Sequence, residues 1–170
     1  LKASEKAGLP KNVFQILHLD HSSTSKVIAD SRIDHVLFTG SVSGGIEVKK
    51  AIGTRFIGAG LELGGKDPAY VRADCNFDHA VENLVDGSYY NSGQSCCGIE
   101  RIYVDEKIFD NFVDAFKAQT EKYILDNPLD NSTNLGPVVK LSAANNIRDQ
   151  VSKALNNGAK NIIDESKFKI

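Results

Sequence analysis

A loop with two adjacent cysteines is the first segment of the sequence whose residues could do chemistry. It spans residues 91–97, contains Gly93, and ends in Cys96 and Cys97. A nucleophilic cysteine must be accessible and needs a thiol with a lowered pKa, and nearby backbone N–H groups can lower that pKa. Cysteine is also a common small buried residue, so the loop by itself is more typical of a packed thiol than of a nucleophile.

An acidic residue in an apolar strand is the second candidate. Glu62 stands between Leu61 and Leu63 and is followed by Gly64 and Gly65. Burial at such a strand end raises the pKa of a carboxyl group and suits it to general base catalysis. An ordinary exposed strand end followed by a glycine turn explains the pattern equally well, and both interpretations stay open on these residues alone.

A turn between a predicted strand and a predicted helix is the third candidate. The apolar run at 36–38 leads to Gly40 and Ser41, and Gly45 lies where helical spacing begins. Unpaired N–H groups at a helix N-terminus attract phosphate, and glycines let a phosphate approach the backbone. The pattern G-x-G-x-x-G does not occur here, so an ordinary strand-to-helix turn is the more common explanation for this segment alone.

Turn residues divide the sequence into apolar runs that alternate with helical patterns, and these elements must position the three segments. Strands are predicted at 13–19, 36–38, 56–57, 61–63, 69–71 and 99–104. Helices are predicted up to Gly8, around Val27, at 45–52, at 77–89 with Asn76 as the N-cap, from Asp105 to Asn127 and Pro128, and at 141–155. This alternation predicts an α/β fold with parallel strands.

The composition argues against several classes of protein. Apolar residues make up 41% and charged residues 25% of the chain, and the net charge of −2 gives no electrostatic signal for nucleic acid or an anionic membrane. Every apolar run is far shorter than the roughly 20 residues that span a bilayer. An odd number of cysteines, two of them adjacent, favours free thiols, so we expect a reducing, cytoplasmic location and no metal site.

The three segments together resemble the signatures of the NAD(P)-dependent aldehyde dehydrogenase superfamily. Residues 38–41 with Gly45 are similar to the family's cofactor turn, residues 61–68 to its glutamate signature and residues 89–96 to its cysteine signature. Their order is that of the family, and so is the interval from the glutamate to the cysteine. Weaker similarities at 7–14 and 127–137 extend the match over essentially the whole chain.

The resemblance implies an α/β, aldehyde dehydrogenase-like fold in two parts. Residues 1–63 are expected to form the C-terminal half of an NAD(P)-binding, Rossmann-like domain, and residues 64–170 the N-terminal part of the catalytic domain. The sequence contains no Met, position 1 included, so we expect it to be a piece of a longer protein. The resemblance places an oxyanion-stabilising asparagine, and further residues that hold the cofactor ribose, outside these 170 residues.

The resemblance also implies roles for individual residues. Cys96 is expected to be the nucleophile and Glu62 the general base, while Cys97 is expected to be a packed neighbour and Cys75 to be incidental. The residues expected to contact the cofactor, NAD or NADP, are Gly40, Ser41, Gly45 and Leu63. One departure from the family lies at residues 18–21, where glycines near the cofactor are usual.

The implied activity is the oxidation of a small-molecule aldehyde to a carboxylic acid with NAD(P)+. The Cys96 thiolate would add to the carbonyl carbon and give a thiohemiacetal, hydride would leave for the nicotinamide, and Glu62 would activate water to hydrolyse the resulting thioester. The backbone N–H of Cys96 would help to stabilise the oxyanion. A homodimer or homotetramer is implied for the full-length enzyme.

Two other hypotheses stay open. Some members of the superfamily transfer the acyl group to coenzyme A instead of water, and Glu62 favours hydrolysis without excluding that transfer. Alternatively, the chain is a truncated, non-catalytic polypeptide that only binds a nucleotide or a partner.

Overall fold

The chain folds into two compact units. The computed structural model describes residues 2–168, and the contacts within it divide the chain into Leu1–Leu63 and Gly64–Ile170. This division falls at the residue where the sequence analysis expects a domain boundary, while the cofactor-binding and thiol-bearing roles expected of the two parts stay predictions. In the part of the chain that the structure describes, no helix is both long and apolar enough to cross a membrane.

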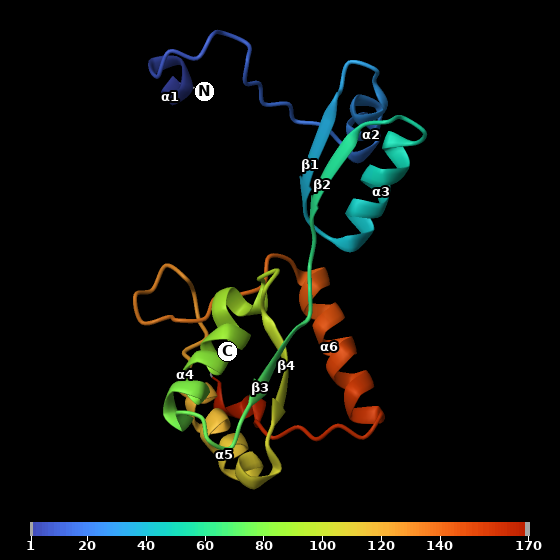
Figure 1. Cartoon of the computed structure of the whole chain (residues 1–170). Helices are drawn as coiled ribbons and strands as arrows, with labels where there is room; N and C mark the ends of the chain where they lie inside the picture. Colours follow the sequence, from blue (N-terminus) through green and yellow to red (C-terminus); the bar gives the residue numbers. More distant parts are fainter. Residues whose placement is uncertain (1, 169–170) are drawn as a thin grey trace. The chain divides into compact units, whose positions relative to one another are not determined.

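Unit 1 (Leu1–Leu63) is built on a pair of parallel strands. Its elements are α1 (Lys2–Lys6), α2 (His21–Ala29), β1 (His35–Thr39), α3 (Val42–Ile52) and β2 (Gly58–Glu62). The pairing runs from His35 opposite Gly58 to Thr39 opposite Glu62. Parallel strands need a crossover connection, and α3 lies in that connection (Figure 1), so both strands end at the same edge of the sheet.

Polar and glycine residues set the ends of α3. The Gly44 N–H donates to the Ser41 Oγ at 3.1 Å, which caps the helix N-terminus. Gly53 follows the last turn with a φ of 61°, a conformation that glycine adopts without a steric penalty. Because Ser41 is the cap, α3 begins at Val42, earlier than the start at residue 45 that apolar spacing predicts.

Unit 2 (Gly64–Ile170) contains a second parallel strand pair and longer helices. Its elements are β3 (Asp67–Val71), α4 (Phe77–Tyr89), β4 (Ile99–Val104), α5 (Phe109–Thr120) and α6 (Leu141–Asn156), with short 3₁₀ helices at Tyr90–Gly93, Glu106–Ile108 and Glu165–Lys167. Asp67 lies opposite Ile99 and Val71 opposite Val104, and α4 lies in the crossover between the strands (Figure 1). Both strand pairs are parallel, which confirms the predicted α/β arrangement.

The core of unit 2 joins β3, α4 and α5. Its buried side chains are Val71, Val81, Val85 and Phe112. The rings of Phe77 and Phe112 pack edge to face with centroids 6.3 Å apart, which fixes α4 against α5. Burying each such side chain contributes about 1.5–3 kcal/mol, so this cluster holds firmly the helix that leads to Cys96.

The strand predicted at 13–19 is wrong. These residues form no strand, and the side chains of Val13, Ile16 and Leu17 are more than half exposed. An apolar run becomes a strand only when a neighbouring strand supplies hydrogen bonds. Among the described residues, β1 and β2 pair only with each other, so this run has no ladder to join.

The strand predicted at 56–57 is wrong, because β1 begins at His35, opposite Gly58, and gives Phe56 and Ile57 no partner. The strand predicted at 61–63 belongs to β2, which starts earlier, at Gly58, and includes the glycines before Leu61. Gly60 lies opposite Leu37, and a Cβ at Gly60 would lie 2.6 Å from the Leu37 Cδ2. Glycine at this position therefore makes room for the Leu37 side chain instead of interrupting the strand.

The helix predicted from Asp105 to Asn127 and Pro128 is shorter than expected. Asp105 caps a 3₁₀ helix, and α5 then runs only from Phe109 to Thr120. Asn134 explains the early end, because the Ile124 N–H donates to the Asn134 Oδ1 at 2.7 Å and the Asn134 N–H donates to the Ile124 carbonyl. Both backbone groups of Ile124 are therefore taken before a helix can use them.

Predictions from long, regular apolar spacing are confirmed. The Asn76 side chain caps α4, β4 covers the predicted residues, and α6 occupies the predicted last helix. Gly158, with a φ of 93°, follows α6 as the expected stop.

Candidate active site

The thiol loop, residues 90–98, carries Cys96 from the end of α4 to the start of β4. Asn91, Ser92 and Gly93 follow one another in the left-handed region, with φ values of 51°, 59° and 72°. For Ser92 this conformation costs about 1–2 kcal/mol, whereas asparagine adopts it more readily, so other contacts must hold Ser92 in place. The run of left-handed residues turns the chain sharply after α4 and leads it to Cys96, whose side chain is exposed.

Two long-range hydrogen bonds anchor the thiol loop. The Ser92 Oγ donates to the Gly136 carbonyl at 2.5 Å, and the Val139 N–H donates to the Gln94 Oε1 at 2.8 Å. The segment 136–139 therefore supports the loop, a function that the sequence analysis missed. The signal in the sequence is the weak family similarity at 127–137, which does not say what the segment contacts.

Gly65 packs against the backbone of Cys96. A Cβ on Gly65 would lie 3.1 Å from the Cys96 carbonyl oxygen, closer than an ordinary van der Waals contact. Lys66 forms an ion pair with Glu100, which keeps this segment beside β4. The glycine of one predicted signature is thus in contact with the cysteine of another, and a side chain at Gly65 would push on the thiol loop.

Cys96 has two properties that a nucleophile needs. Its side chain is exposed, and no acceptor for its backbone N–H occurs among the described residues. That N–H is therefore available to a negatively charged oxygen or sulfur.

The other two thiols differ from Cys96 and from each other. The prediction that Cys97 is a packed neighbour is wrong, since its side chain is exposed and its Sγ lies 3.3 Å from the Ser95 Oγ. The general tendency of cysteine to be buried does not account for a sharp loop, which exposes successive side chains. Cys75 is partly buried and packs against the core cluster of unit 2.

In unit 1 the predicted cofactor residues lie together at the edge where β1 and β2 end. The Gly40 N–H donates to the Glu62 carbonyl at 3.0 Å, which joins the turn after β1 to the end of β2. Ser41 caps α3, and a Cβ on Gly45 would lie 2.9 Å from the Leu63 Cδ2, so α3 packs directly on Leu63. Ligands of parallel sheets bind outside the carboxyl ends of the strands, where a helix N-terminus also attracts phosphate.

A pocket of about 390 Å³ lies beside this edge. Its lining residues are Val42, Gly45, Ile46, Lys49, Lys50, Leu61 and Leu63. Two of the predicted cofactor residues, Gly45 and Leu63, are among them. Apolar walls can hold a ring system and the two lysines supply positive charge for a phosphate, so these residues fit a dinucleotide.

Glu62 lies at the end of β2, opposite Thr39. Its side chain is exposed, so the burial considered from the sequence is not found. The reason is its place at the end of a two-stranded sheet, where few neighbours cover a side chain. Glu62 belongs to unit 1 and Cys96 belongs to unit 2. The surroundings of each residue are therefore described only within its own unit.

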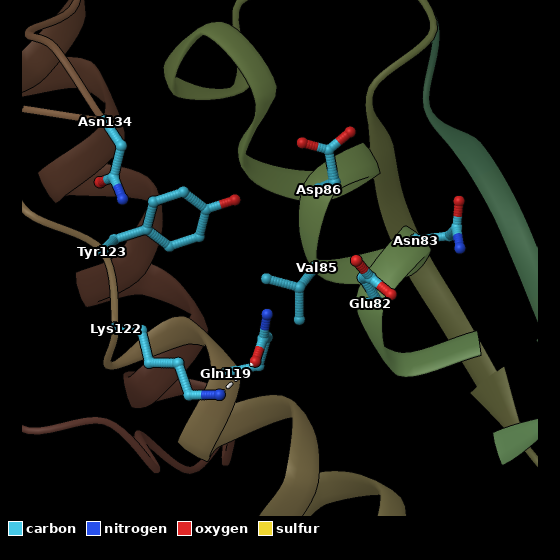
Figure 2. Close-up of a pocket in the computed structure, with 8 residues that line it drawn as sticks. All are labelled: Glu82, Asn83, Val85, Asp86, Gln119, Lys122, Tyr123 and Asn134. Atoms are coloured by element: carbon cyan, nitrogen blue, oxygen red, sulfur yellow. Dashed lines mark hydrogen bonds between the residues drawn. The ribbon is translucent and has the colours of Figure 1, made fainter. Parts of the chain in front are cut away.

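A larger pocket, in unit 2, includes no predicted site residue. Figure 2 shows it, with a volume of about 410 Å³ and a lining of Glu82, Asn83, Val85, Asp86, Gln119, Lys122, Tyr123 and Asn134. The Lys122 Nζ donates to the Gln119 Oε1 at 2.7 Å, and burial, with the charge of Asp86 nearby, raises the pKa of Tyr123. Between residues 2 and 168 there is no cluster of three or more His, Cys, Asp or Glu side chains that could hold a metal ion.

Comparison with protein families and curated proteins identifies relatives of the chain. The model of the "Aldehyde dehydrogenase family" matches residues 1–169. The chain is 34% identical over 162 residues to the NAD(P)+ succinate semialdehyde dehydrogenase Sad of Escherichia coli, covering 95% of this chain and 35% of that protein. It is 33% identical over 157 residues to a 3-sulfolactaldehyde dehydrogenase of Priestia megaterium, covering 92% and 32%.

Solved structures give the same result for the fold. A betaine aldehyde dehydrogenase of Staphylococcus aureus in complex with NAD+ matches with a TM-score of 0.88 at 30% identity, over 95% of this chain and 32% of that one. A glyceraldehyde-3-phosphate dehydrogenase of Methanocaldococcus jannaschii complexed with NADP matches with a TM-score of 0.88 at 31% identity, over 95% and 35%. The chain spans only about a third of the length of these relatives. Its sequence and its aldehyde dehydrogenase-like α/β fold show that it belongs to the aldehyde dehydrogenase family.

Proposed function

We propose that the protein containing this chain oxidises a small-molecule aldehyde to a carboxylic acid with NAD(P)+, with Cys96 as nucleophile and Glu62 as general base. The observation that carries the proposal is the exposed Cys96 thiol on a loop held by two long-range hydrogen bonds. Relatives named as dehydrogenases of succinate semialdehyde and 3-sulfolactaldehyde support an aldehyde as the substrate.

Cys96 would form the covalent bond to the substrate. Addition of its thiolate to the carbonyl carbon gives a thiohemiacetal whose oxygen carries a negative charge. The Cys96 N–H, which has no acceptor among the described residues, is free to donate to that oxygen. Departure of the hydrogen on that carbon with its electron pair then leaves a thioester on the Cys96 sulfur.

The cofactor, NAD or NADP, would supply the acceptor for that electron pair and hydrogen. Gly40, Ser41, Gly45 and Leu63 would hold it, since they lie together where the strands of unit 1 end and where α3 begins. The complexes of relatives with NAD+ and with NADP support either form of the cofactor.

Glu62 would complete the reaction by accepting a proton from water as that water attacks the thioester carbon. The carbon–sulfur bond breaks, the carboxylic acid leaves, and the Cys96 thiolate is restored while Glu62 holds the proton taken from water. The exposed side chain of Glu62 gives it access to water, and the hydrogen bond from the Gly40 N–H to its carbonyl fixes its backbone.

We also propose that the full-length protein is a homodimer or homotetramer of the cytoplasm. The described chain has three free cysteines, which fits a reducing compartment. Light scattering on the purified full-length protein tests the oligomeric state, and a monomer would contradict it.

The experiment that tests the proposed reaction compares full-length Cys96→Ala with Cys97→Ala. Cys96→Ala should form no NAD(P)H from any of a panel of aldehydes, because no thiohemiacetal can form. Cys97→Ala is the matched control, since it removes an equally exposed neighbouring thiol, and it should keep the parent rate. NAD(P)H formation by Cys96→Ala at the parent rate would contradict the proposal, and strict dependence on added coenzyme A would replace hydrolysis by acyl transfer.

A further inference from the structure

The Gln94 side chain joins the thiol loop to a segment far from it in the sequence. Its Oε1 accepts a hydrogen bond from the Val139 N–H at 2.8 Å. Its Nε2 donates to the Asn91 carbonyl at 3.0 Å, and the Asn91 Nδ2 donates back to the Gln94 carbonyl at 3.1 Å. Both ends of one amide group are therefore in use two residues before Cys96.

The thiol loop needs such ties because its conformation is locally unfavourable. Asn91 and Ser92 have positive φ values, and a loop of this kind relaxes when nothing holds it. Asn91 is bonded to Gln94, and Ser92 is bonded to Gly136, in the same segment as Val139. The two anchors thus connect the strained residues to 136–139.

The bond from Val139 to Gln94 joins two exposed groups. Val139 is 85% exposed and Gln94 is exposed as well. Water competes for hydrogen bonds between exposed groups, so removing such a bond changes the stability of the fold little. What the bond does supply is a link between the thiol loop, which carries Cys96, and the backbone at Val139.

We infer that Gln94 is a positioning residue for Cys96, which it serves by holding the thiol loop to the Val139 backbone. The inference rests on the proposed role of Cys96 as the nucleophile. Gln94 does not act on the reacting atoms itself. It keeps the sulfur where attack on a bound carbonyl carbon has the right distance and direction.

The test uses three variants of the full-length protein. Gln94→Met keeps the length of the side chain and removes both hydrogen bonds. Gln94→Glu keeps an oxygen that can accept from the Val139 N–H but loses the donor to the Asn91 carbonyl. Gln119→Met is the matched control, because it removes an amide of α5 whose one side-chain hydrogen bond among residues 2–168 comes from the Lys122 Nζ.

Gln94→Met should lower kcat, and the rate of Cys96 alkylation by iodoacetamide, by about tenfold to a hundredfold, the range that a small misplacement of reacting atoms costs. KM for the aldehyde and the unfolding temperature should change little. Gln94→Glu should recover most of kcat and should shift the alkylation profile of Cys96 to higher pH, because the added carboxylate disfavours a thiolate nearby. Gln119→Met should behave as the parent.

Parent-like kcat and alkylation in Gln94→Met would overturn the inference, and so would equal losses in Gln94→Met and Gln94→Glu. A Gln94→Met variant that does not fold would also overturn the inference, because it would show that Gln94 serves the stability of the fold and not the placement of the thiol loop. The activity of Cys96→Ala distinguishes a failure of the proposed function from a failure of the role inferred for Gln94. An active Cys96→Ala refutes the proposed function, whereas an inactive Cys96→Ala together with parent-like Gln94 variants refutes only the role of Gln94.

Discussion

Two adjacent exposed thiols, Cys96 and Cys97, differ in what surrounds them. The Cys97 sulfur lies 3.3 Å from the Ser95 hydroxyl, whereas the Cys96 sulfur has no hydrogen-bond partner among the described residues. The Cys96 N–H is also without an acceptor in that part of the chain. The Cys97 N–H has none there either, so the contact with Ser95 is what separates the two thiols: it occupies the Cys97 sulfur and leaves the Cys96 sulfur open to an electrophile.

We therefore expect iodoacetamide at neutral pH to modify Cys96 before Cys97 and Cys75 in the full-length protein. Cys75 is shielded because it packs against the core cluster of unit 2. Peptide mass mapping at a low ratio of reagent to protein measures the order of labelling. Cys97→Ala should leave the labelling rate of Cys96 unchanged, and initial labelling at Cys75 or Cys97 would contradict the assignment.

For individual residues, the sequence predicts which side chains are candidates for catalysis but not how exposed those side chains are. The similarity to the family signatures predicts Cys96 and Glu62 as the catalytic residues. The packing expected for Cys97 and the burial considered for Glu62 are not found, because both side chains are exposed. Exposure depends on the path of the thiol loop and on the neighbours at the end of β2, and neither is encoded in a local pattern. The roles of Cys96 and Glu62 themselves stay predictions.

At the scale of elements, regular apolar spacing predicts helices well and their ends poorly. The stripe on α4 was predictable because its apolar side chains recur at helical intervals and face the core. The end of α5 was not, because it depends on Asn134, which lies far along the chain from Ile124. The missing strand at 13–19 has the same cause, since a strand needs a partner that the run itself does not contain.

Contacts between distant segments also decide how the site is built. Gly65 touches the Cys96 carbonyl, and the segment 136–139 holds Ser92 and Gln94. No periodicity reveals these contacts. The contacts explain why position 65 is a glycine, and they explain what holds Asn91 and Ser92 in the left-handed conformation.

Gly65→Ala should lower kcat by about tenfold or more, because the added Cβ would lie 2.9 Å from the Asp67 Oδ1, which can move aside, and 3.1 Å from the Cys96 carbonyl oxygen, which moves only with the thiol loop. Gly64→Ala is the matched control, since a Cβ there meets no atom within 4 Å. Steady-state kinetics with saturating cofactor measure the difference. Equal activity of the two variants would show that the contact of Gly65 with the loop has no catalytic consequence.

At the scale of the whole molecule, the proposed catalytic residues are divided between the two units. Glu62 and the cofactor residues belong to unit 1, and Cys96 belongs to unit 2. The chain spans about a third of the length of its relatives, so further contacts to the cofactor can come from the rest of a protein of that length.

The isolated chain of 170 residues should therefore bind NAD more weakly than the full-length protein does. Each lost hydrogen bond to a charged or bidentate partner costs about 1.5–3 kcal/mol, or about tenfold to a hundredfold in affinity. Calorimetric titration of both proteins under the same conditions measures the difference. An equal Kd for the two proteins would mean that unit 1 already contains the complete cofactor site.

In the proposed reaction, Cys96 carries the acyl group and Glu62 drives its release by water. In full-length Glu62→Gln, loss of the general base should slow release by about a hundredfold to ten-thousandfold, so the acyl group accumulates after one turnover. Glu47→Gln, the same change on the exposed face of α3, is the control and should accumulate none.

The most direct measurement is the peptide mass of Glu62→Gln, quenched with acid after brief reaction with an aldehyde and NAD(P)+. We expect one equivalent of NAD(P)H per site and the mass of the acyl group on the peptide that contains Cys96. An acyl group on another residue, or continued NAD(P)H formation at the parent rate with Cys96 unmodified, would contradict it.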